Sequence, residues 1–196
     1  MFKTGLKFVL VLGLGFLLAG CGVQSIPMAK NEVEAKLAEI SNQYKRRADL
    51  IPNLVKVVKG YAEQEKEVLI GVTEARAKAT QSTIDPSKVT PQQLQQFQQA
   101  QGGLSQALGR LMVVVEKYPN LKSDQNFRDL QAQLEGTENR ITVARNRYIE
   151  TIKNFNNLVT VFPTSLTNSL FFKHEKMPQW EADAGQAPAE APKVEF

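Results

Sequence analysis

The sequence predicts an all-α protein, folded as an antiparallel up-and-down bundle of long helices. Its apolar residues recur at alternating steps of three and four along most of the chain, which is the period of one face of a helix. Turn residues separate these stretches, and no alternation of apolar and polar residues predicts a strand. Long helices with short connections pack most simply side by side. The rival arrangement is an extended coiled coil between chains, because the same heptads would satisfy it.

The first 20 residues predict a lipoprotein signal peptide. Lys3 and Lys7 precede an apolar run over residues 8–18. Its eleven residues would rise about 16 Å as a helix, too little for a hydrocarbon core about 30 Å thick. The only cysteine of the chain, Cys21, follows three residues that resemble a lipobox, namely Leu18, Ala19 and Gly20. The alternative is a transmembrane anchor with an incidental cysteine.

Cys21 would be the lipidated first residue of the mature protein and would hold it on the extracytoplasmic side of a membrane. Several acyl chains are needed, because one chain gives only marginal binding. Gly22 stands where aspartate would retain a lipoprotein at the inner membrane, so we expect an outer-membrane protein facing the periplasm if the cell has two membranes. We expect residues 21–30 to form a tether. Loss of Lys3 and Lys7 lowers the formal net charge from +4 to +2, and we expect no nucleic-acid partner.

Residues 31–80 predict two helical pieces, over about 31–50 and 53–80. Pro52 lies inside the apolar pattern, and an interior proline removes a backbone hydrogen bond and clashes with the preceding turn. We therefore expect the first helix to be kinked or broken near Pro52. Arg47 and Glu65 occupy apolar positions of the pattern, so each lies at the edge of the seam or has a buried partner. The apolar positions are Val33, Leu37, Ile40, Tyr44, Ile51, Leu54, Val58, Tyr61, Val68, Val72, Ala75 and Ala79.

Two further long helices follow residues 80–90, which are rich in turn and capping residues. Thr90 and Pro91 resemble an N-cap and the first helical residue, and the helix should end near Pro119. Its apolar seam contains one polar residue, Gln101. Ser123 is expected to begin the last long helix, whose apolar stripe extends over 127–162, and Pro163 is expected to end it.

The C-terminal residues divide into two parts. The stretch 164–180 is too short for a long helix and too apolar to be free, so we expect it to pack on the end of the bundle. Residues 181–196 are rich in alanine, proline and glutamate, and they predict a disordered acidic tail.

Two blocks of this sequence resemble the LemA family of bacterial membrane-associated helical proteins. They are QYKRRADLIPNLVKVVKGYAEQEKEVLIGVTEARAKA, residues 43–79, and ENRITVARNRYIETIKNFNNLVTVFPTSL, residues 138–166. The resemblance implies an all-α up-and-down bundle over residues 31–180, and it brings no agreed biochemical activity. The sequence departs from the family pattern in its anchor, which resembles a lipobox rather than a retained transmembrane helix.

The densest polar groups near the apolar seams lie in these two blocks. Such a cluster suggests a ligand or partner site at the kink, because arginines can grip phosphate or carboxylate. The structural alternative is that Arg47 and the Glu138 region form ion pairs between helices, while Asn53 or water satisfies the carbonyl freed by Pro52. The residues are Arg46, Arg47, Asp49 and Asn53 in the first block, and Glu138, Arg140, Arg145 and Arg147 in the second.

Recognisable catalytic sets are missing from the sequence. With one cysteine and one histidine, His174, it offers no multi-histidine or cysteine-based metal site, and it shows no phosphate-binding glycine loop. We therefore expect no catalytic residue, no metal and no cofactor. The sequence favours a non-enzymatic, lipid-anchored interaction module or scaffold with an envelope protein as partner. The alternatives are a self-associating structural protein, and a receptor for a small anionic ligand at the arginine- and asparagine-rich kink.

Overall fold

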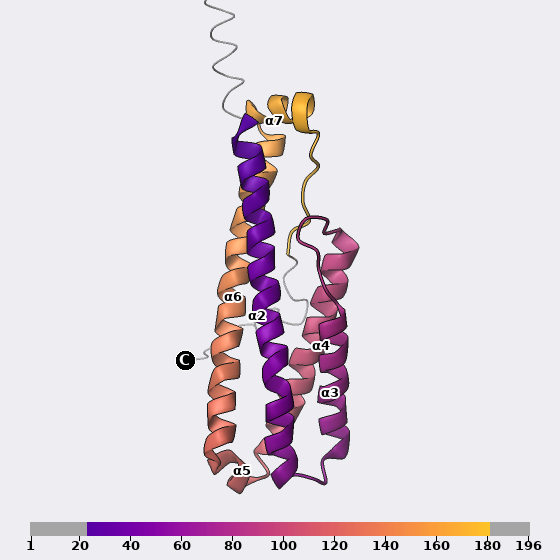
Figure 1. The fold of residues 1–196 in the computed structure, drawn as a ribbon, viewed down its shortest axis with the longest axis vertical. Helices are drawn as coiled ribbons and strands as arrows, with labels where there is room; N and C mark the ends of the chain where they lie inside the picture. Colours follow the sequence, from indigo (N-terminus) through magenta and orange to yellow (C-terminus); the bar gives the residue numbers. More distant parts are fainter. Residues whose placement is uncertain (1–22, 181–196) are drawn as a thin grey trace, which may run out of the picture.

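A computed structural model describes residues 23–180, which form an elongated antiparallel bundle of helices (Figure 1). The four long helices are α2 (Ser25–Tyr61), α3 (Lys66–Gln81), α4 (Pro91–Val115) and α6 (Gln125–Thr160), and each runs opposite to the one before it. Three short elements complete the fold, namely α5 (Pro119–Ser123), α7 (Thr164–Thr167) and the π-helix η1 (Asn168–Phe172). The prediction of an all-α up-and-down bundle is confirmed. No helix among the described residues is long and apolar enough to cross a membrane.

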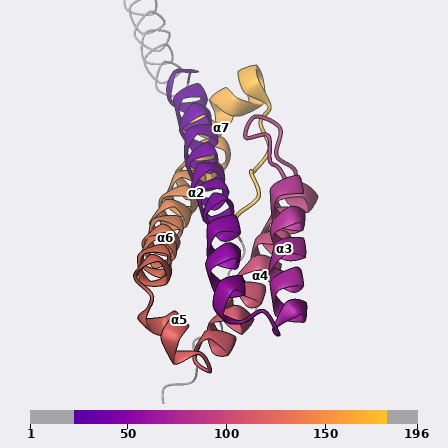
Figure 2. The ribbon, with the colours of Figure 1, turned by 60° about the horizontal axis from the view of Figure 1, so that its bottom comes forward.

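The bundle is longer on one side than on the other. Helices α2 and α6 pack against each other along their length, whereas the shorter pair α3 and α4 lies beside their lower half in the view of Figure 1 (Figures 1 and 2). We call the end at which α2 begins the proximal end, and the end that carries α5 the distal end. Helix α7 and η1 lie across the proximal end (Figure 2).

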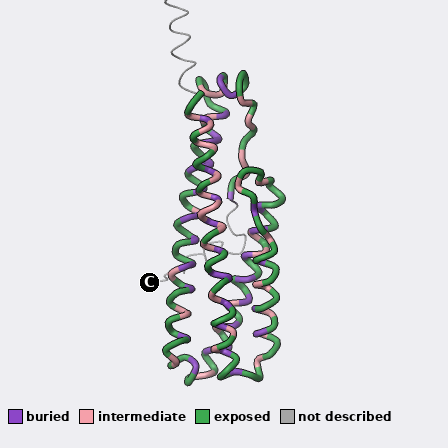
Figure 3. The backbone as a smooth tube through the Cα atoms, in the orientation of Figure 1, coloured by how far each residue is buried: buried purple, intermediate pink, exposed green. Residues whose placement is uncertain are grey.

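Buried side chains line the inner faces of the helices, and exposed ones cover the outside (Figure 3). They form two apolar clusters, one above the other. The proximal cluster comprises Ile26, Val33, Leu37, Ile40, Tyr44, Ile84, Leu94, Phe97, Ile141, Ala144, Tyr148, Ile152, Phe155, Val159 and Trp180. The distal cluster comprises Ile51, Leu54, Val58, Ala62, Leu69, Val72, Ala79, Leu104, Ala107, Leu111, Val115, Leu121, Phe127 and Leu134. Helices α2, α4 and α6 contribute to both clusters.

Pro52 does not break the first helix: of the kink or break expected there the break is wrong, and so are the predicted ends of the two pieces at 50 and 53. Helix α2 continues through Pro52 to Tyr61, and the helical run is interrupted at residues 62–65 instead. A proline at position 52 cannot donate to the carbonyl of Ala48, four residues earlier. The side chain of Arg76 on α3 donates to that carbonyl, with Nε 2.8 Å from the oxygen. A neighbouring helix thus supplies the hydrogen bond that proline removes, a role the sequence had suggested for Asn53 or water.

Helix α2 begins at Ser25, inside the segment expected to be a tether. Ile26 is fully buried in the proximal cluster, so residues 25–30 belong to the folded bundle. The expected tether over 21–30 is therefore wrong from Ser25 onward. The signal peptide over 1–20, Cys21 and the tail over 181–196 lie outside the described residues.

The caps of the later helices follow local side-chain chemistry. Thr90 caps α4 as predicted: its hydroxyl accepts from the Gln93 amide, and the Gln93 side chain accepts from the Thr90 amide. Helix α6 is capped by Asp124, whose carboxylate accepts from the Phe127 amide. The expectation that Ser123 begins this helix is wrong, because Ser123 ends the short helix α5.

The C-terminal segment leaves the proximal end and returns along the bundle (Figure 1). The expected packing on the bundle end holds for α7 and η1, whereas residues 173–180 lie beside the helices. The Asn156 side chain holds this return by accepting from the Met177 amide at 2.9 Å and donating to the Met177 carbonyl at 3.2 Å. Trp180 is 6% exposed and packs on Tyr44, Phe97 and Tyr148, one from each of three helices.

Candidate functional site

The most unusual polar group of the described chain is Arg47, which is only 2% exposed. It lies on the inner face of α2, between Tyr44 of the proximal cluster and Ile51 of the distal cluster. A buried charge is costly unless it is paired and hydrogen-bonded. The partners of Arg47 therefore decide what this position does.

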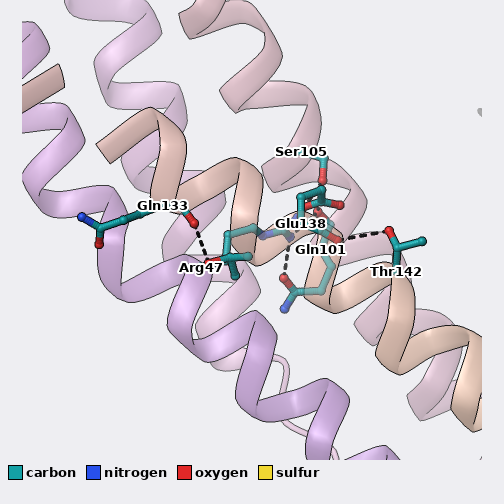
Figure 4. A network of polar contacts seen from close by, with 7 residues as sticks. Arg47, Gln101, Ser105, Gln133, Glu138 and Thr142 are labelled. Carbon is teal, nitrogen blue, oxygen red and sulfur yellow. Dashed lines mark hydrogen bonds and ion pairs between the residues drawn. The ribbon is translucent and has the colours of Figure 1, made fainter. Parts of the chain in front are cut away.

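Arg47 is the centre of a hydrogen-bond network that joins the four long helices. Figure 4 shows Arg47 with Gln101, Ser105 and Glu138. Its Nη1 donates to Oγ of Ser105 on α4 and to Oε2 of Glu138 on α6, each at 3.0 Å. Its Nη2 donates to the backbone oxygen of Gln101 at 3.1 Å and to Oε1 of the same residue at 2.9 Å. The Gln101 amide nitrogen in turn donates to the carbonyl of Ala79 on α3, at 3.1 Å. We call these five residues the Arg47 network.

Arg47 forms its ion pair with a partner that is partly open to solvent. Glu138 supplies the opposite charge, and its side chain is 52% exposed, so one edge of the ion pair reaches solvent. The guanidinium carbon also lies 4.9 Å from the centre of the Tyr44 ring, a cation–π distance. Both terminal nitrogens of the planar guanidinium are directed at four acceptors, an arrangement suited to holding helices in register, whereas the buried Nε has no hydrogen-bond partner among the described residues.

Three other predicted residues reinforce the contact between α2 and α6. Arg140 donates to the side chain of Gln43 at 3.3 Å, and Arg147 forms an ion pair with Glu39 at 3.1 Å. Arg145 lies over the ring of Trp180, with 5.2 Å between the guanidinium carbon and the ring centre. The first two contacts are largely exposed, so each stabilises the pair of helices only weakly.

The remaining predicted residues do not join the network. Arg46, Asp49 and Asn53 are exposed on α2, whereas Arg47 points into the bundle. The arginine- and asparagine-rich group suggested by the sequence is therefore divided between the inside and the surface of one helix. The residues are adjacent in sequence but lie on different faces, as the helical period requires.

Sequence reasoning missed Gln101, Ser105 and Arg76 as partners. A signal existed for Gln101, because it is the one polar residue in the apolar seam of its helix, just as Arg47 is in the seam of α2. Two polar residues in opposed apolar seams are expected to hydrogen-bond to each other, since either side chain alone would be buried without a hydrogen-bond partner. Ser105 and Arg76 lie off the apolar seam positions, and nothing in the spacing marked them.

The described residues present few other groups for chemistry. Burial raises the pKa of the Tyr148 hydroxyl far above its ordinary value, so this phenol stays neutral. Among residues 23–180, no group of three or more histidine, cysteine, aspartate or glutamate side chains is placed to hold a metal ion. The Arg47 network remains the best-defined polar arrangement in this part of the chain.

Comparison with known proteins identifies relatives over most of the chain. The sequence profile of the LemA family matches residues 36–196, which include every member of the Arg47 network. The chain is 26% identical over 185 residues to the magnetosome proteins MamQ 1 and MamQ 2 of Paramagnetospirillum magneticum, a match that covers 83% of this chain and 66% of each of theirs. It is 24% identical over 161 residues to protein LemA of Metamycoplasma hominis, covering 82% of this chain and 67% of that one. The chain thus spans about two thirds of the length of these relatives.

Proposed function

The chain belongs to the LemA family, and from this premise we propose that it is a lipid-anchored helical bundle of the cell envelope that serves as a non-enzymatic interaction module or scaffold for envelope proteins. Membership of the family implies a membrane-associated helical protein, and the relatives described above are known by names that state no reaction. The lipid anchor and the role as a scaffold are proposed in addition to what family membership implies.

The observation that carries the proposal is how the polar groups of the bundle are used. The side chains of Arg47, Gln101 and Glu138 bond to one another and to backbone carbonyls, and these contacts link four helices in one register. Such a core supports a rigid body, and its outer faces remain available for other proteins. A receptor for a small anionic ligand at the arginine- and asparagine-rich kink would have to use the exposed Arg46 and Asn53, since the terminal nitrogens of Arg47 are engaged by Glu138, Gln101 and Ser105.

The anchor is supported by the sequence around Cys21. The lipobox-like residues lie directly before it, and the folded bundle begins four residues after it, at Ser25. Lipidation would therefore hold the proximal end of the bundle next to a membrane. Acyl chains on one cysteine are sufficient for stable anchoring when more than one is attached.

Replacing Cys21 tests the anchor. Cys21→Ser should leave an unprocessed precursor and remove the acyl mass from the N-terminal peptide in mass spectrometry. The matched control is Ser25→Cys, which adds a cysteine outside the lipobox position and should not shift the site of lipidation. An N-terminus in Cys21→Ser that matches the wild type would refute lipidation.

Crosslinking in cells tests the scaffold. A photoreactive residue is placed at Val113 on α4 and, separately, at Ile149 on α6, both exposed apolar positions on the sides of the bundle. A scaffold should give a stoichiometric crosslink to a foreign envelope protein that a control lipoprotein with the same residues 1–24 does not give. Crosslinks to the chain itself alone would favour the self-associating alternative, and the absence of any crosslink from both positions would count against both.

A further inference from the structure

The segment at the proximal end of the bundle buries polar residues and exposes apolar ones, although Phe172 packs on the proximal cluster. In α7 and η1 the polar residues Thr167 and Asn168 are buried, at 5% and 6% exposure. Leu170 and Phe171 are 65% and 67% exposed in the same segment. Asn168 is buried because its side chain bonds to the backbone of His174, at 2.9 and 3.0 Å, and to the carbonyl of Val159. A segment that faces only water would bury its apolar side chains and expose its polar ones.

Other exposed apolar side chains extend this surface. Phe162 precedes α7 and is 76% exposed, the highest value among the exposed large apolar residues of the described chain, and Leu166 is 56% exposed. We call Phe162, Leu166, Leu170 and Phe171 the apolar cap. The sequence had placed Phe162 on the apolar stripe of the last long helix, but α6 ends at Thr160 and leaves this ring outside the core. Four exposed apolar side chains within ten residues of sequence, three of them spaced by four, indicate an interaction surface.

The cap lies in a long stretch without charge. Residues 154–172 contain no aspartate, glutamate, lysine or arginine, although 22% of the chain is charged. Lys153 and Lys173 stand at the two borders of this stretch. Uncharged polar groups and apolar side chains, with cationic groups at the margin, suit the interface of a bilayer, where buried charges are costly and lysines reach toward headgroups.

The position of the N-terminus connects this surface to a membrane. Helix α2 begins at the proximal end, where α7 and η1 also lie (Figures 1 and 2). Cys21 precedes Ser25 by four residues, and four extended residues reach at most about 14 Å. An acylated Cys21 would therefore hold the proximal end within about 14 Å of the bilayer surface, less than half the reach of a ten-residue tether.

We propose that the apolar cap is a second membrane contact, inserted into the interfacial region of the bilayer beside the anchored N-terminus. This proposal rests on the anchorage proposed above. The cap would sit at the boundary between headgroups and acyl chains, as apolar faces of interfacial helices do. Two contacts at one end would restrict the tilt of the bundle and hold its long axis away from the membrane plane.

Fluorescence quenching by lipids tests the cap. The full chain is purified from the membranes of an expressing bacterium and reconstituted into vesicles of phosphatidylethanolamine and phosphatidylglycerol, with or without brominated acyl chains. Phe171→Trp places a reporter in the cap, and Val113→Trp places one at a 66% exposed site toward the distal end. Trp180, the only native tryptophan, gives a common background. Brominated lipid should remove the added emission of Phe171→Trp and leave that of Val113→Trp unchanged.

The other outcomes separate the cap from the anchor. Added emission at position 171 that resists brominated lipid and is quenched by aqueous iodide would overturn the proposal. Emission that resists both quenchers would overturn it in favour of a second copy or a protein partner on the cap. Lipid quenching without acyl mass on the N-terminal peptide would support membrane contact by the cap and refute the lipid anchor. Acyl mass on that peptide without lipid quenching would support the anchor and refute membrane contact by the cap. Far-UV circular dichroism confirms that both variants remain folded.

Discussion

The hydrogen-bond partners of the buried Arg47 guanidinium differ in their own burial. This difference determines how much the free energy of unfolding falls when Arg47 is replaced. Gln101 is 5% exposed, so its side-chain oxygen would be left without a donor if Arg47 were shortened. Glu138 is half exposed and would turn to water. The cost therefore falls mainly on the contact with α4, even though the ion pair is made with α6.

We expect Arg47→Met to lower the free energy of unfolding by about 1–3 kcal/mol, because a buried acceptor loses its donor. Arg47→Met combined with Gln101→Leu should recover part of this loss, since both polar partners are then removed. Arg147→Met is the matched control, and loss of its exposed ion pair with Glu39 should cost at most about 1 kcal/mol. Urea denaturation measures all three. Equal effects of the two single substitutions would contradict the assigned role of Arg47.

Pro52 and Arg76 form a second pair of residues whose effects should depend on each other. With Pro52 present, Arg76→Met leaves the Ala48 carbonyl without its side-chain donor and should cost about 1–2 kcal/mol. In a Pro52→Ala background a backbone amide can donate to the same carbonyl, so Arg76→Met should cost less. A double-mutant cycle by urea denaturation measures the coupling. Equal costs in the two backgrounds would show that Arg76 does not replace the bond that proline removes.

At the scale of the helices, the sequence predicted most of the fold, because periodicity and local capping decide most of it. The fold class, the α4 cap at Thr90 and the Arg47–Glu138 contact followed from spacing and from residue types. The continuity of α2 through Pro52 did not, since the donor to the Ala48 carbonyl, Arg76, lies 24 residues after Pro52. The interruption at residues 62–65 contains neither proline nor glycine, so the pattern gave no sign of it.

The C-terminal segment shows a further limit of sequence reasoning. Its apolar residues predicted that it packs on the bundle, but Leu170 and Phe171 are exposed while Trp180 is buried. Trp180 enters the core because Tyr44, Phe97 and Tyr148 of three different helices surround its ring. Spacing within one segment cannot report which side chains of other helices it meets.

His174 packs this segment against Phe155 of the proximal cluster, and we expect this contact to depend on pH. Its ring stacks on Phe172 at 5.9 Å and lies 6.0 Å from the ring of Phe155. Partial burial, and then the positive charge of Lys30, lower the pKa of His174 below its ordinary value of 6.5. The folded protein thus disfavours the protonated ring, so the stability that His174 contributes is present above pH 6.5 and is lost as pH falls through the lowered pKa.

We therefore expect acidification below pH 6.5 to destabilise the wild type more than a His174→Gln variant. The chain has one histidine, so its ring proton gives an unambiguous NMR titration. Lys30→Gln should raise the measured pKa of His174 toward 6.5, because it removes the nearby charge. Lys36→Gln is the control on the same helix. A wild-type pKa at or above 6.5 would contradict the proposed burial of this ring.

At the scale of the whole molecule, the two apolar clusters meet at the Arg47 network, and three helices pass through both. Helices α2 and α6 have 37 and 36 residues, which corresponds to about 55 Å each. A helix that passes through the Arg47 network has continuous backbone hydrogen bonds. Loss of packing in one cluster therefore destabilises the part of that helix that lies in the other cluster. The clusters should therefore unfold together rather than as two separate bodies.

Substitutions in the two clusters test this cooperativity. Ile152→Ala in the proximal cluster and Leu111→Ala in the distal cluster each remove a fully buried side chain and should cost about 2–5 kcal/mol. Trp180 fluorescence reports the proximal cluster, while far-UV circular dichroism reports all helices. In detergent solution the two signals should give the same urea midpoint for the wild type and for each variant, because the shared helices couple the clusters. A Leu111→Ala protein that loses helical signal before Trp180 responds would show instead that the Arg47 network separates two independently unfolding halves.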